Sequence, residues 1–152
     1  MISQRTARAT VTVDLGAVAD NVARLRAVSA PAAVWAVVKA DAYGHGAVHV
    51  GRAAAEARAV VLLKGPDTLV ADPAGQVAVV GVETHGLATA GSGDVLTGAI
   101  AALLAKGLPP FEAAVCAALA HARAGAAAAE RYGPAGIIAG DVIDALPSAF
   151  RS

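Results

Sequence analysis

The sequence has few features that would cross-link the chain through disulfides or anchor it in a membrane. Its single cysteine, Cys116, cannot form an internal disulfide. We therefore expect a reducing, cytoplasmic setting and interpret Cys116 as a small buried hydrophobic residue rather than a nucleophile. The apolar run at residues 95–105 is too short for a bilayer, which requires about 20 residues. No apolar stretch follows the charged N-terminus, so we predict no signal peptide and no membrane partner.

Aromatic and charged residues are also scarce, at 3% and 16% of the chain, and the formal net charge is zero. The sequence has no basic stripe and no interleaved aromatic residues, so we expect no nucleic-acid partner. Alanine, valine, leucine and glycine supply most of the 57% hydrophobic content. This composition argues against disorder and is typical of helices packed closely on a sheet. The length suits one domain with a real core.

The first third of the chain predicts an alternation of strands and helices. Residues 9–14 alternate β-branched side chains and indicate a strand, and Asp14 is placed to cap the helix that follows it. Residues 33–39 form a nearly continuous apolar run, which is typical of a strand buried on both faces. A glycine-containing loop is expected at 42–46 and a helix at 47–58. Parallel α/β layers are built from such units.

The pattern changes after residue 58. Short apolar segments at 60–63, 68–71 and 77–82 are separated by turn sequences and predict a β-meander. A long loop rich in small residues follows at 83–93. The last part of the chain then predicts helices with clear start and stop signals. These helices are expected at 94–106, ended by Gly107 as a C-cap, at 111–131, and at 139–146, ended by Pro147. We therefore predict an α/β fold.

The segment from Gly91 to Asp94 has the composition of an anion-binding loop at a helix start. Gly91 and Gly93 carry no side chains that would keep a phosphate from the backbone. The first N–H groups of a helix lack internal partners, and the helix dipole attracts anions. Asp94 is a good N-cap residue, and it is also placed to act as a general base. A capped helix with a glycine-rich entry loop remains the structural alternative, because short glycine loops are weak signals.

Three blocks in the second part of the chain resemble one enzyme family in the same order. They read VLLKGPDT at 61–68, LATAGSGDVLTG at 87–98 and AGDVIDALP at 139–147. The stretch from residue 60 to about 150 thereby resembles the C-terminal part of ADP/ATP-dependent NAD(P)H-hydrate dehydratases, in the ribokinase-like superfamily. One departure is Thr84-His85-Gly86, where members often carry Asn-Pro-Gly.

That resemblance implies a fold, a reaction and a set of site residues. The fold would be part of a ribokinase-like α/β domain, and the reaction would be dehydration of hydrated NADH or NADPH, driven by ADP or ATP with Mg²⁺. The backbone of Gly91, Ser92 and Gly93 would bind the nucleotide phosphates. Asp94 would be the catalytic base at the hydrated nicotinamide ring, and Lys64 would lie near the nucleotide. For Lys64, spacing alone indicates no more than a solvated lysine at a strand end.

A second lysine ends a strongly apolar strand beside a glycine loop. Partial desolvation of Lys39 there would lower its pKa and free an amine for imine formation, and Tyr43 could donate a hydrogen bond to a phosphate. Taken by itself, Lys39 is better explained as a strand-end lysine whose ammonium reaches solvent.

The sequence around this lysine resembles a different family. VTVDL at 11–15, NVARL at 21–25 and WAVVKADAYGHG at 35–46 resemble the opening of a bacterial alanine racemase, which begins a (β/α)₈ barrel. This resemblance implies that Lys39 carries pyridoxal phosphate as a Schiff base and that Tyr43 contacts the cofactor phosphate. His45 and His49 have no third ligand at a sensible spacing, so we predict no metal site. His85 is expected in a loop and His121 on the surface of a helix.

Three hypotheses therefore compete. The chain is a dehydratase-type nucleotide-binding segment, a pyridoxal-phosphate racemase segment, or an inactive fusion of two gene fragments. We divide it into a racemase-like part, residues 1–58, and a dehydratase-like part, residues 59–152. The dehydratase assignment covers the larger share and is preferred as the family, while for activity we expect a chain that is incomplete as an enzyme. Because an incomplete sheet leaves exposed edges, self-association is a further expectation.

Overall fold

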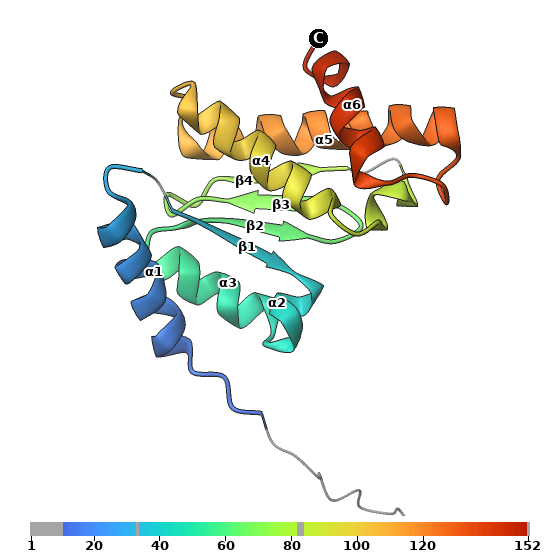
Figure 1. The fold of residues 1–152 in the computed structure, drawn as a ribbon. Helices are drawn as coiled ribbons and strands as arrows, with labels where there is room; N and C mark the ends of the chain where they lie inside the picture. The colour runs from blue at the N-terminus through green and yellow to red at the C-terminus, as the bar shows by residue number, and fades with distance from the viewer. Residues whose placement is uncertain (1–10, 33, 82–83, 152) are drawn as a thin grey trace, which may run out of the picture.

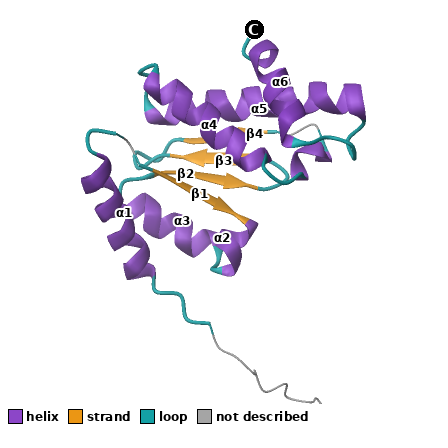
Figure 2. Ribbon diagram, viewed as in Figure 1, coloured by secondary structure: helices purple, strands orange, loops and turns teal. Residues whose placement is uncertain are grey.

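The computed structural model describes residues 11–32, 34–81 and 84–151. Helices lie on both sides of one small sheet (Figures 1 and 2). In chain order the elements are α1 (Leu15–Ser29), β1 (Trp35–Lys39), α2 (Ala40–Gly44), α3 (Ala47–Glu56), β2 (Val60–Lys64), β3 (Thr68–Ala71), β4 (Val77–Val80), the 3₁₀ helix η1 (His85–Ala88), α4 (Ser92–Ala105), α5 (Pro110–Tyr132) and α6 (Ala139–Ala149).

The four strands lie in sequence order, β1-β2-β3-β4. The hairpins from β2 to β3 and from β3 to β4 are antiparallel, which confirms the predicted β-meander. β1 adds to this meander as a parallel edge strand, in a register that pairs Trp35 with Val60 and Lys39 with Lys64. The fold is thus α/β, and one sheet contains strands from both sides of residue 58. The division of the chain into two domains stays a prediction.

One face of the sheet is covered by α4 and α5. Leu62 and Val70 are fully buried there and pack with Leu96 and Ile100 of α4. α5 contributes small side chains to this core, at Ala114, Ala117, Ala118 and Ala122. Because alanine side chains are short, the helix axis can lie close to the sheet. This alanine-rich contact agrees with the composition of the chain.

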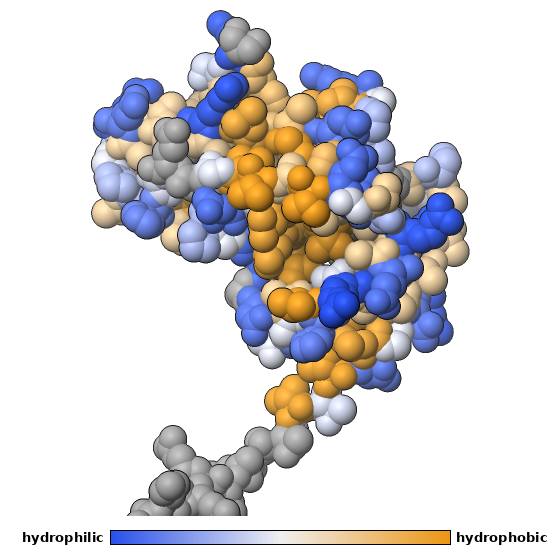
Figure 3. Space-filling view, turned by 180° about the vertical axis from the view of Figure 1, so that it is seen from behind, coloured by the Kyte–Doolittle hydropathy of each residue, from blue (hydrophilic) through white to orange (hydrophobic). Residues whose placement is uncertain are grey.

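The other face is only partly covered. Val38 of β1 and Val61 of β2 pack against Ala54 of α3, with Val22 of α1 in the same cluster. β3 and β4 have no helix in this layer among the described residues. Their outward side chains are exposed, at Leu69 (37%), Val77 (66%) and Val79 (64%). Figure 3, the view from behind, shows apolar surface gathered in a hollow near the middle of the molecule.

The start of the chain differs from the prediction. Residues 9 and 10 of the expected strand lie outside the described residues, and residues 11–14 are not a strand. Val11 is 78% exposed, so it has no apolar neighbours of the kind that would hold it in a sheet. The predicted cap of α1 is confirmed, because Asp14 Oδ1 accepts hydrogen bonds from Gly16 N–H at 2.8 Å and Ala17 N–H at 3.2 Å.

The helix after the glycine-rich loop begins earlier than predicted. The N-cap of α4 is Gly91, not Asp94, which instead lies in the first turn. Gly91 has φ +84°, a left-handed conformation that glycine adopts without strain. At the other end the prediction is confirmed. Gly107 has φ +88°, and its N–H donates to Leu104 O at 2.9 Å in a glycine-ended helix terminus.

Two further predictions are wrong. α6 does not end at Pro147 but continues to Ala149, since a proline removes only its own N–H and Phe150 N–H still donates to Leu146 O at 3.2 Å. Cys116 is exposed rather than buried. It lies on the side of α5 that faces away from the alanine-lined core. None of the helices in the described ranges is both long and apolar enough to cross a membrane.

Candidate functional site

Buried contacts with η1 and α5 hold the glycine-rich loop in place. Ser92 Oγ donates a 2.6 Å hydrogen bond to Leu87 O in η1, so its hydroxyl points into the protein. Nε2–H of His121, on α5, donates to Ser92 O at 2.8 Å. Leu87 itself packs so closely on Gly125 that a Cβ there would lie 2.5 Å from Leu87 Cγ. The start of α4 is therefore held in a set position by α5.

The same loop leaves a backbone donor free. Asp94 N–H and Val95 N–H both donate hydrogen bonds to Gly91 O, at 3.0 and 3.1 Å. In the described part of the chain, Gly93 N–H has no hydrogen-bond partner. It lies in the first turn of a helix of 14 residues. Such an unpaired donor at the positive end of a helix dipole favours an anion.

Two lysines lie at this loop. Lys39 and Lys64 are register partners at the ends of the parallel strands β1 and β2. Side chains alternate along a strand, so both point to the face that carries α4. A Cβ built on Gly93 would lie 3.4 Å from Lys39 Nζ. These residues line one pocket of about 660 Å³, together with Asp67, Thr84, His85 and Gly91. We call it the basic pocket.

The charges in the basic pocket affect one another. Burial lowers the pKa of Lys64, and the positive charge of Lys39 lowers it further. Burial also lowers the pKa of His121 to about 4, with Lys64 contributing and the hydrogen bond to Ser92 opposing the shift. His121 is therefore neutral near pH 7. The two ammonium groups repel each other, so an anion between them would relieve that repulsion.

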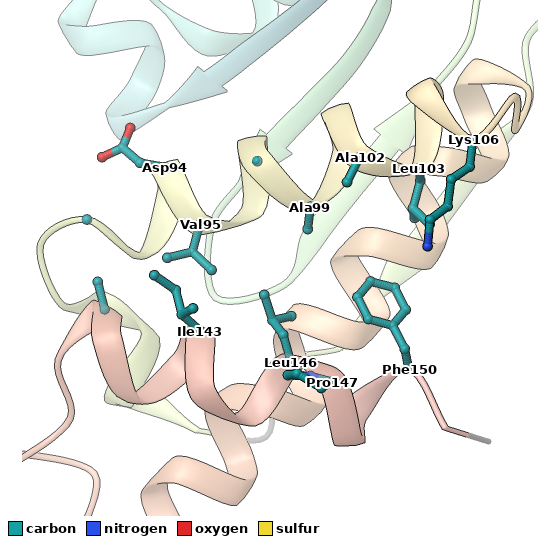
Figure 4. A pocket seen from close by; sticks show the side chains of 13 residues that line it. Asp94, Val95, Ala99, Ala102, Leu103, Lys106, Ile143, Leu146, Pro147 and Phe150 are labelled. Carbon is teal, nitrogen blue, oxygen red and sulfur yellow. The ribbon is translucent and has the colours of Figure 1, made fainter.

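A second, apolar groove begins on the other side of the loop. It has a volume of about 870 Å³ and lies between α4 and α6. Figure 4 shows Asp94 at one end and Lys106 at the other, with Ile143 and Phe150 among the apolar side chains between them. Gly91 lines both the groove and the basic pocket. Asp94 and the backbone donor of Gly93 thus lie at two adjoining cavities.

The turn after Lys39 has an unusual backbone. Asp41, Ala42 and Tyr43 have φ values of +54°, +53° and +57°, a left-handed conformation that costs energy for each side chain. Asp41 Oδ1 supports the turn by accepting a 2.6 Å hydrogen bond from Ala47 N–H at the start of α3. Tyr43 is 65% exposed, and its ring centroid is 5.8 Å from Lys39 Nζ. The expected glycine loop at 42–46 is therefore a left-handed turn that presents Tyr43 beside Lys39.

The structure brings together most of the predicted site residues. Lys64, Gly91, Ser92 and Gly93 line the basic pocket, and so does Lys39, which belonged to the other predicted site. Asp94 lies at one end of the apolar groove instead, with its carboxylate pointing away from the apolar side chains there (Figure 4). Tyr43 does not line the basic pocket. In the described ranges, no group of three or more His, Cys, Asp or Glu residues could hold a metal ion.

His121 is the residue that sequence reasoning missed. We predicted a helix-surface histidine, but it is only 2% exposed. The signal was available: His121 follows Ala114, Ala117 and Ala118 at helical spacings of seven, four and three, so it lies on the same face as these buried alanines. That spacing could have placed it in the core.

Comparisons with known proteins agree with the larger of the two sequence resemblances. The bifunctional NAD(P)H-hydrate repair enzyme of Moorella thermoacetica is 48% identical over 99 residues, which are 65% of this chain and 19% of that protein. The Bacillus subtilis ADP/ATP-dependent NAD(P)H-hydrate dehydratase, co-crystallised with ATP and Mg²⁺ and soaked with CoA, has a similar fold. Its TM-score is 0.69 at 23% identity, over 78% of this chain and 48% of that one.

The first part of the chain has a different relative. The alanine racemase of Beutenbergia cavernae is 68% identical over 50 residues, which are 33% of this chain and 13% of the racemase. The racemase resemblance is thus local. The chain spans about a fifth of the length of the Moorella protein.

A family model described as NAD(P)H-hydrate dehydratase matches residues 34–148, which include β1, the basic pocket and all but the last residue of α6. This match crosses residue 58 and covers the elements that hold the glycine-rich loop. On that evidence the chain belongs to the NAD(P)H-hydrate dehydratase family.

Proposed function

We propose that the chain binds the phosphates of ADP or ATP in the basic pocket and that Asp94 acts as a base on hydrated NADH or NADPH. The observation that carries this proposal is the free N–H of Gly93 at the start of α4, in one pocket with Lys64. Helix dipole, backbone donor and ammonium group all favour the same kind of ligand, a phosphate.

The position of Asp94 supports a separate role. It lines the apolar groove, whereas the lysines line the basic pocket. An apolar groove suits a nicotinamide ring better than it suits a phosphate. A base there can accept the proton of a substrate hydroxyl while the nucleotide phosphate stays on the other side of Gly91.

Mg²⁺ fits this scheme as part of the nucleotide complex. The described residues offer no cluster that would hold the ion by themselves. Mg²⁺ commonly keeps several waters and is bound through substrate phosphates with one or two carboxylates. When bound, it would neutralise phosphate charge.

Binding and turnover test the two parts of the proposal. We expect Mg²⁺–ATP or Mg²⁺–ADP to shift the ¹H–¹⁵N signals of Gly91, Gly93 and Asp94. Lys64→Gln should weaken binding measured by calorimetry. Asp94→Asn should still bind the nucleotide but should no longer dehydrate hydrated NADPH, so the absorbance of the hydrate should stay constant. Asp144→Asn removes an exposed carboxylate of α6 outside both cavities and serves as the matched control.

The alternatives make different predictions. Equal nucleotide binding by wild type and Lys64→Gln would contradict the phosphate site. Normal dehydration by Asp94→Asn would contradict the base. A folded chain that binds no nucleotide and no pyridoxal phosphate would favour an inactive fusion of two fragments. The pyridoxal phosphate assignment of Lys39 and Tyr43 requires that borohydride reduction links the cofactor to Lys39, and it stays a prediction.

We also propose a cytoplasmic location and self-association. A single cysteine is consistent with the first. The exposed apolar side of β3 and β4 is consistent with the second. A mass that stays monomeric at all concentrations in sedimentation would contradict self-association.

A further inference from the structure

We propose that Lys39, a residue of the racemase-like segment, is a second phosphate-binding cation of the nucleotide site. The inference rests on the proposed function, because it adds a residue to the same pocket. Neither sequence resemblance assigns Lys39 this role: one leaves it out, and the other gives it a Schiff base. The structure places it where the two segments meet.

The sheet register is the first support. Lys39 and Lys64 are paired across parallel strands, so their side chains leave the same sheet face at the same level. Both then line the basic pocket. A pair of ammonium groups in one pocket suits two oxygens of one polyphosphate. The arrangement depends on β1 being part of the sheet, so it exists only when both segments are present in one fold.

The approach to Gly93 is the second support. Lys39 Nζ lies 3.4 Å from the position that a Cβ of Gly93 would occupy. The absence of that side chain leaves room for a ligand oxygen between the ammonium group and the free N–H. A phosphate there would receive hydrogen bonds from both. Charge-assisted bonds of this type are among the stronger ones in proteins.

The unbalanced charge is the third support. Lys39 contributes to the lowered pKa of Lys64, so the two ammonium groups interact across the pocket. Asp67 is the carboxylate that lines the basic pocket, and it is exposed to solvent. A polyanion is the ligand that turns this repulsion into attraction. Binding would raise the pKa of Lys64 and take up protons in alkaline solution.

The stacking of Lys39 on Tyr43 does not oppose this role. The ring centroid lies 5.8 Å from Nζ and Tyr43 is largely exposed, so the contact is a weak one. It orients the ammonium group without burying it. Lys39 thus remains free to meet a ligand in the basic pocket.

The test compares charge-matched variants of the whole chain. We expect Lys39→Gln to weaken Mg²⁺–ATP binding roughly tenfold by calorimetry, and Lys39→Arg to restore most of it. Arg131→Gln removes one exposed positive charge at the C-terminal end of α5 that does not line the basic pocket, and it is expected to bind like wild type. Dispersed ¹H–¹⁵N spectra confirm that each variant folds.

A second readout separates a binding role from a structural one. Calorimetry in two buffers of different ionisation enthalpy, at alkaline pH, gives the protons taken up on binding. We expect fewer in Lys39→Gln, because the pKa of Lys64 is then less depressed in the free protein. Loosening of the fold would also raise the pKa of Lys64 by exposing it, so the proton count is compared only between variants whose ¹H–¹⁵N spectra stay dispersed.

The outcomes distinguish this inference from the proposed function. If Lys64→Gln loses Mg²⁺–ATP binding but Lys39→Gln binds and takes up protons like wild type, Lys39 plays no part and the nucleotide site stands. If inorganic triphosphate binds in a Lys39-dependent way but Mg²⁺–ATP does not, Lys39 is confirmed as an anion ligand and the nucleotide function is wrong. If neither ligand binds to wild type, both proposals are overturned.

Discussion

The two faces of the sheet are built differently. The face under α4 and α5 is closed, with Leu62 and Val70 fully buried. The opposite face is closed only over β1 and β2, where α3 packs, and is open over β3 and β4. The glycine-rich loop and both lysines belong to the closed face. The difference indicates that stability and binding geometry come from one face, while the other face is left available for contact.

The largest expected effect is on the closed face. Leu62→Ala removes a fully buried side chain from the middle of the core and should lower the free energy of unfolding by about 2–5 kcal/mol. A leucine on the opposite face of the next strand is a matched control. Leu69→Ala makes the same chemical change on the open face and should cost less than about 1 kcal/mol. Urea unfolding measures both. Equal losses would mean that the open face is covered.

The next effect depends on pH. His121 has a pKa of about 4 in the folded protein, against about 6.5 when unfolded. Below pH 6.5 the unfolded chain binds a proton that the folded chain does not, so stability falls as pH drops from 6.5 to 4. The loss should approach about 3 kcal/mol. Below the folded pKa it should level off.

His121→Gln is the control for this pH dependence. Its amide keeps an N–H donor for Ser92 O but does not titrate. The difference in unfolding free energy between wild type and this variant should therefore change across pH 4–6.5. His49→Gln, at an exposed position on α3, should follow wild type. An NMR titration that gives His121 an ordinary pKa in the folded protein would contradict the prediction directly.

A smaller effect tests how α5 supports the glycine-rich loop. Alanine in place of glycine inside a helix normally adds about 1 kcal/mol of stability. At Gly125 the new Cβ would lie 2.5 Å from Leu87 Cγ, and such overpacking costs about 1–3 kcal/mol. We expect Gly125→Ala to be destabilising overall and to shift the signals of Gly91 and Gly93.

Gly98 provides the opposite case. It lies within α4, and a Cβ there would meet nothing within 4 Å. Gly98→Ala should therefore raise the thermal midpoint, while Gly125→Ala lowers it. Stabilisation by both variants would show that Leu87 yields easily and does not hold the loop.

Local sequence signals predicted much of the closed face. Thr68–Ala71 was predicted with the observed bounds, and α5 within one residue at each end, because turns, prolines and glycines mark these elements locally. The glycine-rich loop and Lys64 were also predicted as one site, through family resemblance. His121 was misplaced although its helical spacing contained the answer.

Other features depend on distant contacts and could not be predicted from local patterns. The pairing of β1 with β2 brings Lys39 to Gly93, more than 50 residues away in the chain. The left-handed turn at Asp41 is held by a hydrogen bond to Ala47 rather than by local preference. The strand expected at 9–14 had the right alternation but, in residues 11–14, no partner strand. An alternating pattern of side chains does not by itself supply a neighbouring strand to pair with.

The smallest expected effect is on the open face. Val79 is 64% exposed in the edge strand β4, so Val79→Lys should change the free energy of unfolding by less than about 0.5 kcal/mol. A lysine on an edge strand opposes pairing with another chain. If copies of this chain associate through the open face, the variant should sediment as a monomer while wild type does not. A loss of stability above about 1 kcal/mol that grows with protein concentration would mean that Val79 is buried in an assembly. The contrast between the two faces would then describe the monomer alone.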